Sequence, residues 1–370
     1  MNTRIRVLVA RAIPVETLDR LRGQFDVEDN QDDIVWDKTE LMRRLNGKAG
    51  AFLTTGERID AEVLDANPQL RAVCNMAVGY NNIDVPACTA RGVLVTNTPD
   101  VLTETTADLG FALMMAAARR VAEGEHYLRA GRWKKWSYDM LTGQDVYGTT
   151  LGILGMGRIG QAIARRGVHG FGMSLLYHNR SRLDAATEAP LKARYVSKEQ
   201  LLRESDHLII VLPYSAANHH TVGAAELALM KPTATLTNIA RGGLVDDAAL
   251  AKALADGRIA AAGLDVFEGE PQVHPGLLAV PNVVLTPHIG SATVSTRRAM
   301  ADLAADNLIA AVSTPHENRR FDGSFINSGV VRGSPLSFSE YCSSRRSPTC
   351  AAERLALPAS CNERLSFFRW

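Results

Sequence analysis

LGILGMGRIG, residues Leu151–Gly160, joins a short apolar run to a glycine-rich turn. The apolar run Leu151–Leu154 predicts a buried strand, because it is short and is bounded by a glycine. A helical pattern follows the last glycine, with Ala162 and Ile163 on one face. The sequence therefore predicts a strand–turn–helix unit at this point of the chain.

The glycines of this turn have the G-x-G-x-x-G spacing typical of dinucleotide-binding proteins. Gly155 permits the tight turn, Gly157 leaves room for a pyrophosphate against the backbone, and Gly160 lets helix and strand pack closely. The helix N-terminus then offers free N–H groups to the phosphates. The candidate cofactor-binding residues here are Gly155, Gly157, Arg158, Ile159 and Gly160.

A basic corner, HNRSR at residues 178–182, follows the next predicted strand, Met173–Tyr177. An acidic residue about 20 positions after the glycines would bind the ribose 2′-OH of NAD, but no carboxylate occurs before Asp184. Two guanidiniums and a hydroxyl suit a 2′-phosphate instead. We therefore expect NADP(H) to be preferred, with NAD(H) possible; a solvated basic loop is the alternative. The candidate residues are Asn179, Arg180, Ser181 and Arg182.

Composition places the chain among globular proteins of two domains. It has 370 residues, of which 46% are hydrophobic and 22% charged, as is typical of soluble domains. A net charge of +1 gives no indication of nucleic-acid or membrane partners. The N-terminal run carries two arginines and predicts a strand rather than a signal peptide. The longest apolar stretch, Leu109–Ala118, is too short to span a bilayer, so the expected location is cytoplasmic.

Cysteines and histidines give no metal or disulfide signature. Cys74 and Cys88 are the only cysteines before residue 342, which excludes a CxxC pair in that range. No H-E-x-x-H or G-x-S-x-G motif occurs, so neither a metal site nor acyl-transfer chemistry is expected. His207 begins an apolar strand and is expected in the core.

Residues 1–100 alternate between strand-like and helix-like segments, which predicts a second parallel α/β sheet without a glycine fingerprint. The loop at residues 76–82, MAVGYNN, can expose backbone N–H groups at its glycine, although a simple turn is the alternative. A long helix is expected from Glu104 to Arg120 with Thr103 as its N-cap, followed by an irregular stretch at residues 121–148. The expected strands are Arg6–Val9, Ala51–Thr54, Arg71–Cys74 and Val93–Thr96, and the expected helices are Val15–Arg22, Lys38–Leu45 and Ala61–Ala66.

Polar residues follow the later predicted strands. These strands are His207–Leu212, Ala234–Thr237, Ala260–Leu264 and Val283–Leu285. Ligands of open parallel sheets bind at the carboxyl ends of the strands. Arg241, Glu270 and His288, which follow three of them, are therefore expected at the same sheet edge as the glycine turn.

These three side chains together match the needs of carbonyl reduction beside a nicotinamide. The Arg241 guanidinium can orient a substrate carboxylate through two hydrogen bonds. The His288 imidazolium can donate a proton as hydride arrives, and the Glu270 carboxylate would favour that protonated form. Each also has a simpler interpretation: His288 as a hydrogen-bonded structural histidine, Arg241 as a surface ion-pair partner and Glu270 as a cap of the following segment.

Several motifs resemble those of the D-isomer-specific 2-hydroxyacid dehydrogenases over about residues 4–312. They are GILGMGRIG, NIARGGLVDDAAL, AAGLDVFEGEP, TPHIGSAT and VGYNNID. The segments FLTTGERID, TPDVLTETTADLGFALMMAAARR and HNRSR are most similar to the bacterial glyoxylate/hydroxypyruvate reductases, also called 2-ketogluconate reductases. The resemblance implies NADPH-dependent reduction of glyoxylate, hydroxypyruvate or 2-keto-gluconate to the D-2-hydroxy acid.

The resemblance also implies roles for individual residues. Arg241 would bind the substrate carboxylate and carbonyl oxygen, His288 would be the acid/base, and Glu270 would be its partner. The backbone N–H groups of Val78 and Gly79 would hold the carboxylate from the other domain. The further cofactor-binding candidates are Pro213, Ile239, Ala240, Asp265 and Gly290.

For the whole chain, the resemblance implies an α/β protein with two Rossmann-like or flavodoxin-like domains, parallel sheets and a cleft between them. Residues 1–100 plus 291–312 would bind substrate, and residues 101–290 would bind the dinucleotide. The second segment of the substrate domain would be a helix starting near Ser291. Members are usually homodimers built through a helix and arm at residues 101–145.

Residues 313–370 depart from the family pattern. This tail is rich in Ser and Arg, holds three of the five cysteines and lacks a sustained period. We expect it to be disordered or poorly packed, as a frame-shifted translation would be, with a partner-binding tail as the alternative. A non-catalytic dinucleotide sensor of the same fold is the alternative function, but it would not need Arg241, Glu270 and His288 together.

Overall fold

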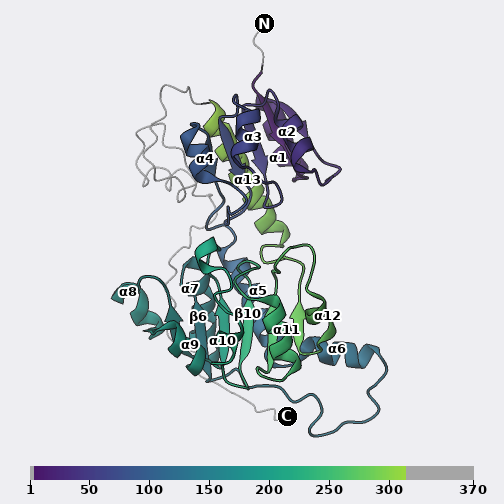
Figure 1. The fold of residues 1–370 in the computed structure, drawn as a ribbon, viewed down its shortest axis with the longest axis vertical. Helices are drawn as coiled ribbons and strands as arrows, with labels where there is room; N and C mark the ends of the chain where they lie inside the picture. Colours follow the sequence, from purple (N-terminus) through teal and green to yellow (C-terminus); the bar gives the residue numbers. More distant parts are fainter. Residues whose placement is uncertain (1–3, 314–370) are drawn as a thin grey trace, which may run out of the picture. The chain divides into compact units, whose positions relative to one another are not determined.

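The computed structural model describes residues 4–313, which contain two parallel sheets (Figure 1). The first sheet has five strands in the order β2-β1-β3-β4-β5, all parallel. This is the flavodoxin-like order of doubly wound folds. Its strands are β1 (Arg6–Val9), β2 (Asp26–Asp29), β3 (Gly50–Leu53), β4 (Ala72–Asn75) and β5 (Leu94–Thr96), and its helices are α1 (Val15–Gln24), α2 (Lys38–Leu45), α3 (Ala61–Ala66) and α4 (Val85–Ala90).

Both faces of the five-stranded sheet are buried. Successive strand residues point to opposite faces, and along β1 they enter two different cores. In β1, Val7 and Val9 pack in a core with Leu18 of α1 and Leu308 of α13 (Val294–Ser313). Leu8, between them, packs in a second core with Leu41 of α2. A sheet buried on both faces explains why these strands read as continuous apolar runs.

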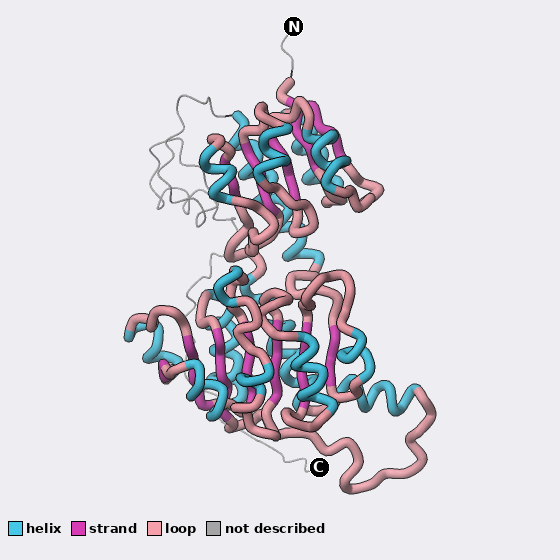
Figure 2. The backbone as a smooth tube through the Cα atoms, in the orientation of Figure 1, coloured by secondary structure: helices cyan, strands magenta, loops and turns pink. Residues whose placement is uncertain are grey.

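The second sheet has seven parallel strands in the order β12-β11-β10-β9-β6-β7-β8 (Figure 2). Its strands are β6 (Thr150–Leu154), β7 (Ser174–His178), β8 (Arg194–Tyr195), β9 (His207–Ile210), β10 (Thr235–Asn238), β11 (Ala261–Leu264) and β12 (Val283–Leu285). The α-helices are α5 (Thr103–Ala118), α6 (Val121–Arg129), α7 (Arg158–Arg165), α8 (Ala185–Glu188), α9 (Lys198–Glu204), α10 (Ala224–Leu227), α11 (Asp247–Ala255) and α12 (Pro275–Ala279).

The strand order of this sheet reverses at β6. The chain moves outward from β6 through β7 to β8, then returns to β9 on the other side of β6 and continues to β12. Doubly wound sheets bind ligands at the carboxyl ends of the strands beside such a reversal. The predicted α/β class with two parallel sheets is confirmed, and the glycine turn after β6 lies at the reversal point.

Several local expectations need correction. Thr103 is the first residue of α5 rather than its cap: Leu102 holds the cap position, and no side chain caps the helix. The stretch expected to be irregular contains a helix, α6. The last helix begins at Val294, three residues after Ser291. The edge strands β2 and β8 were not expected at all. The tail expected at residues 313–370 lies, apart from Ser313, outside the described residues.

The predicted core position of His207 is confirmed. His207 is 1% exposed and bonds Thr235 Oγ1 and the Asp145 carbonyl through its two ring nitrogens. Cys74 and Cys88 are buried free thiols, and burial raises the pKa of each to about 12. None of the helices between residues 4 and 313 is long and apolar enough to cross a membrane.

Candidate active site

The glycine turn after β6 has little room for side chains on its inner side. Gly155 has φ +107°, and a Cβ there would lie 2.7 Å from the carbonyl carbon of Val211. A Cβ on Gly160 would lie 2.5 Å from the carbonyl oxygen of Gly155. Both positions therefore require glycine. Gly155 has a positive φ and approaches the residue after the neighbouring strand β9, and Gly160 lets α7 pack closely against the turn.

Gly157 differs, because open space lies in front of it. It is the N-cap of α7 and provides no side-chain cap, and a Cβ there would meet nothing within 4 Å. The N–H groups of a helix start that no side chain caps fit a dinucleotide pyrophosphate. The neighbouring candidates are already engaged: Arg158 pairs with Asp100 at 2.8 Å, and Ile159 packs against the apolar cores.

The basic corner after β7 is only partly free. Arg182 donates two hydrogen bonds to Glu188, at 2.9 and 2.7 Å, and these bonds, together with one from Tyr177, lower the pKa of Glu188 to about 2. Arg180 and Ser181 are exposed and have no side-chain partner within residues 4–313. The corner therefore offers one free guanidinium rather than the expected two.

Asn179 joins this corner to the glycine turn. Its Oδ1 accepts a hydrogen bond from the Met156 N–H at 2.6 Å, and its carbonyl accepts one from the Tyr195 hydroxyl at 3.0 Å. The Tyr195 ring stacks on His178, with centroids 5.7 Å apart. The backbone before Arg180 is therefore fixed relative to the turn.

His288 and Glu270 form a hydrogen-bonded pair. His288 Nδ1 lies 2.7 Å from Glu270 Oε2, and Glu270 Oε1 accepts the Phe267 N–H at 2.9 Å. Burial acts to raise the pKa of Glu270, but the hydrogen bond and charge of His288, the Phe267 N–H and the charge of Arg241 together outweigh it, so the pKa lies below its ordinary value. Both side chains are about one-third exposed, at 36% and 32%, which leaves the imidazole accessible.

Asp265 holds the turn that carries His288. Its Oδ1 accepts the Ile289 N–H and its Oδ2 the Gly290 N–H, both at 2.8 Å, and the Thr286 hydroxyl also donates to Oδ1 at 2.6 Å. Burial raises the pKa of Asp265 despite the Thr286 bond. The side chain is buried and its oxygens are occupied, so Asp265 contributes to the site by positioning the turn.

Arg241 reaches the loop that follows β4. Its Nε donates to Asn81 Oδ1 at 3.0 Å and its Nη1 to the Ala240 carbonyl at 2.7 Å, whereas Nη2 has no acceptor within the described residues. A Cβ on Gly79 would lie 1.9 Å from Nη2, so this approach needs glycine. Burial lowers the pKa of Arg241, and the charge of Glu270 opposes that shift; the two charges therefore interact.

Two amides hold the loop at Val78 and Gly79. Asn97 donates to the Val78 carbonyl and Asn75 to the Gly79 carbonyl, each at 2.9 Å. The N–H groups of Val78 and Gly79 have no acceptor in the part of the chain that the structure describes. With their carbonyls tied back, these N–H groups can bind an anion.

The other cofactor candidates are mostly backbone positions. Ile239 is 6% exposed and would contact a Cβ on Gly110, so its side chain lies in the core. Ala240 follows it, with its N–H bonded to Asn238 Oδ1, and the carbonyl of Pro213 accepts from Asn218 Nδ2. These residues lie after β10 and β9, beside the strand ends that precede Arg241 and Glu270.

The structure thus adds three amides, Asn75, Asn81 and Asn97, which sequence reasoning missed. Asn81 bonds Arg241 across a separation of 160 residues, and Asn97 lies 19 residues from its partner. A single sequence contains no signal for such bonds, because asparagine is common in turns whether or not it has a distant partner.

Comparison with known proteins finds one family model and many similar chains. A model described as the NAD binding domain of D-isomer specific 2-hydroxyacid dehydrogenases matches residues 111–290. The glyoxylate reductase of Thermococcus gammatolerans is 47% identical over 331 residues, covering 88% of this chain and 97% of that protein. The glyoxylate reductase of Pyrococcus horikoshii is 48% identical over 309 residues, covering 82% and 92%.

Solved structures with a similar fold include an enzyme of the same kind as these relatives. A protein from Thermus thermophilus has a TM-score of 0.77 at 44% identity, covering 84% of this chain and 97% of that one. An NADPH-dependent glyoxylate/hydroxypyruvate reductase from Sinorhizobium meliloti, in complex with NADP and malonate, has a TM-score of 0.74 at 39% identity, covering 84% and 95%.

Proposed function

This chain belongs to the D-isomer specific 2-hydroxyacid dehydrogenases and is an NAD(P)-dependent oxidoreductase, and we propose that it uses NADPH to reduce glyoxylate, hydroxypyruvate or 2-keto-gluconate to the D-2-hydroxy acid. The observation that carries the proposal is the 2.7 Å bond between His288 Nδ1 and Glu270 Oε2. The two residues of this bond follow β11 and β12, and Arg241 follows β10, the next strand of the same sheet.

Arg241 and the loop at Val78 and Gly79 bind the substrate carboxylate. The free Nη2 of Arg241 and the two free N–H groups are the donors for this anion, and such charge-assisted bonds are stronger than neutral ones. Asn81 and the Ala240 carbonyl hold the other guanidinium nitrogens. The guanidinium is thus oriented before substrate arrives.

His288 supplies the proton. Its Nδ1 is tied to Glu270, which leaves Nε2–H to donate to the substrate carbonyl oxygen as the C–H bond forms. The nicotinamide, when bound, supplies the hydride to the carbonyl carbon. The Glu270 charge stabilises the imidazolium before transfer, and a positioned acid of this kind contributes roughly 10²–10⁴-fold in rate.

The preference for NADPH follows from the corner after β7. Arg180 is exposed and unpaired within the described residues, and Ser181 beside it offers a hydroxyl. No carboxylate in this corner is free to bind a ribose 2′-OH, because Asp184 caps α8 by accepting the Thr187 N–H. A 2′-phosphate is the better partner for this charge pattern.

Oxidation of NADPH, followed by absorbance with glyoxylate, hydroxypyruvate, pyruvate and 2-keto-gluconate in turn, tests the proposal. We expect turnover with at least one acid of the proposed class, a higher kcat/KM with NADPH than with NADH, and a loss of roughly 10²–10⁴-fold in kcat for His288→Gln. Tight NADPH binding without turnover of any 2-keto acid would instead favour a non-catalytic dinucleotide sensor.

We also propose that the substrate domain comprises residues 1–100 and 291–312, with residues 101–290 as the dinucleotide domain and a cleft between the two. Packing of α13 against β3 and β4 supports this division, because α13 completes the core of the five-stranded sheet. Inter-domain sites of this kind are common for small ligands.

A homodimer formed through residues 101–145 is the proposed assembly. Helix α6 has no buried residue, and the segment around it exposes large apolar side chains: Val121, Leu128, Trp133, Trp136 and Tyr138. Several large apolar side chains exposed within one short segment are typical of a subunit contact. Light scattering should give twice the chain mass, and Leu128→Glu with Trp136→Ser should give a monomer.

The cytoplasmic location stays a prediction.

A further inference from the structure

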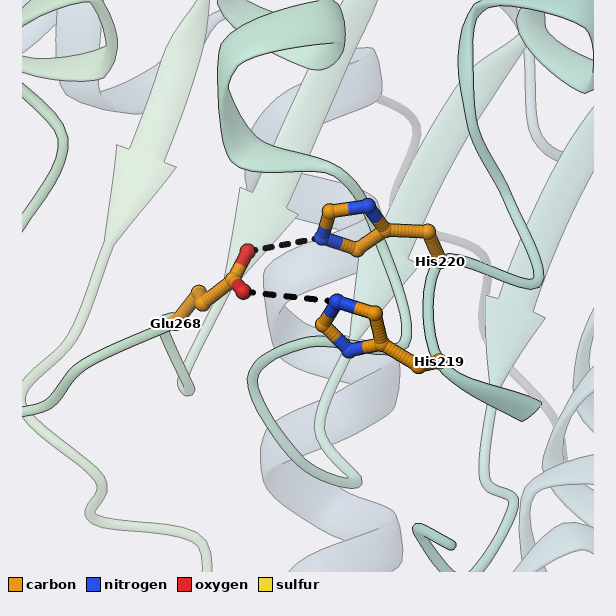
Figure 3. A group of neighbouring side chains, drawn as sticks. All are labelled: His219, His220 and Glu268. Atoms are coloured by element: carbon orange, nitrogen blue, oxygen red, sulfur yellow. Dashed lines mark hydrogen bonds and ion pairs between the residues drawn. The ribbon is translucent and has the colours of Figure 1, made fainter. Parts of the chain in front are cut away.

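Two histidines and a glutamate that have no part in the proposed reduction lie close together (Figure 3). His219 and His220 lie in the loop after β9, and Glu268 lies in the segment after β11. Nε2 of His219 is 3.6 Å from Glu268 Oε1, and Nε2 of His220 is 2.8 Å from Oε2. All three ligand atoms lie within 4.8 Å of one another.

The remaining ring nitrogens have partners of their own. His219 Nδ1 lies 3.2 Å from the Tyr214 hydroxyl, and His220 Nδ1 lies 3.8 Å from Asp246 Oδ2. Metal-binding histidines usually donate their other ring N–H to an oxygen, which fixes the ring and leaves the opposite nitrogen for the ion; the Tyr214 hydroxyl is within that range of His219, whereas Asp246 lies only at ion-pair distance from His220. Both rings therefore present Nε2 toward the same carboxylate.

The backbone holds this arrangement in place. The His220 N–H donates to the Gly243 carbonyl at 2.7 Å, and the Glu268 N–H donates to Asp247 Oδ2 at 3.0 Å. The two imidazoles stack with centroids 3.8 Å apart and planes 23° apart. The three side chains are between 35% and 43% exposed, so an ion can reach them from solvent.

We propose that His219, His220 and Glu268 bind a divalent transition-metal ion of the zinc class, with water as the fourth ligand. Two imidazole nitrogens and one carboxylate suit Zn²⁺, Cu²⁺ or Ni²⁺, whereas Mg²⁺ and Ca²⁺ prefer oxygen ligands alone. Metal–ligand bonds of about 2.0–2.2 Å place tetrahedral ligand atoms about 3.4 Å apart. The two Nε2–oxygen separations, 3.6 Å to Oε1 and 2.8 Å to Oε2, involve different carboxylate oxygens, so an ion held by both imidazoles and one oxygen requires the two stacked rings to tilt toward each other.

A bound ion would link the loop after β9 to the segment after β11. Glu268 precedes Glu270 by two residues, and Glu270 bonds both Phe267 and His288. The ion would thus restrain the segment that carries the partner of the proposed proton donor. The site is therefore a candidate for metal-dependent regulation of this enzyme.

Calorimetric titration of the full-length protein with Zn²⁺ tests the proposal. We expect the wild type to bind with an affinity at least about tenfold higher than His220→Asn or Glu268→Gln. Asparagine suits position 220, whose φ is +50°. The control is His126→Ala, which removes an exposed histidine that lies 3.9 Å from Glu125 outside the cluster; this variant should bind like the wild type.

Asp246→Asn provides a second, independent variant. The Asp246 side chain also caps α11 by accepting the Ala249 N–H, a role that asparagine can fill. It removes the negative charge 3.8 Å from His220 Nδ1, so it should weaken Zn²⁺ binding by less than the roughly tenfold loss typical of a hydrogen-bonded partner, while leaving the melting temperature without metal unchanged. Equal Zn²⁺ affinity in the wild type, His220→Asn and Glu268→Gln would overturn the proposal and leave a simple ion pair.

Discussion

His288 occupies a backbone conformation that few residues adopt. Its φ is +54°, in the left-handed region where histidine is several-fold enriched over most non-glycine residues. The strain is offset by Asp265, whose carbonyl accepts the His288 N–H and whose carboxylate accepts the next two N–H groups. Strain at a functional residue, held by its surroundings, is a recurring feature of active sites.

Cofactor selectivity should depend more on Arg180 than on Arg182, because Arg182 is held by Glu188. Loss of one charge-assisted bond of about 1.5–3 kcal/mol predicts that Arg180→Ala raises the KM for NADPH roughly 10–100-fold and leaves that for NADH nearly unchanged. Arg182→Ala should have the smaller effect. Steady-state kinetics with both cofactors measure this, and an equal loss in the two variants would contradict it.

The sequence could predict this corner's charge but not how much of that charge is available. Glu188 lies six residues after Arg182, and its position depends on the turn of α8 and on the Tyr177 hydroxyl. Arg241, Glu270 and His288 could be proposed from the sequence, because each follows a strand of the same sheet within six residues. Partners joined by long-range folding, such as Asn81, have no such marker.

At the scale of elements, the glycine turn offers a matched pair of substitutions. Gly155→Ala combines a φ of +107° with a 2.7 Å clash and should lower the unfolding free energy by more than about 1 kcal/mol. Gly157→Ala meets open space, so its stability should change by less than about 1 kcal/mol.

The same pair separates folding from cofactor binding. A methyl group on Gly157 would occupy the space proposed for the pyrophosphate, so the KM for NADPH should rise about tenfold, equivalent to about 1.4 kcal/mol. Urea unfolding and NADPH titration of both variants give the two quantities. A Gly157→Ala protein that binds NADPH normally would show that the phosphates lie elsewhere.

Elements with an apolar core face were predictable, and elements without one were not. The continuous apolar runs of β1, β6 and β9 reflect burial on both faces of a sheet. Strand β2 has the sequence DVED and pairs only with β1 at the sheet edge, and α6 buries no residue. Local pattern therefore could not identify either one.

At the scale of the whole molecule, the catalytic proposal uses no residue beyond α13. The proposed catalytic and substrate-binding side chains and N–H groups come from positions 78–288, and α13 completes the core of the five-stranded sheet before residue 314. Removal of residues 318–370 should therefore leave kcat/KM for glyoxylate unchanged. A large loss of activity in a truncated protein with a normal melting temperature would assign the tail a role in catalysis.

The pH dependence of kcat/KM for glyoxylate reduction, compared between the wild type and Glu270→Gln, tests the proposed proton donor most directly. The pKa of Glu270 lies below its ordinary value, so its carboxylate is charged throughout the neutral range and favours protonated His288. Reduction consumes that proton, so the rate should fall as the pH rises, and in Glu270→Gln the fall should begin at a lower pH. Alkaline limbs that coincide in the two proteins would contradict the account.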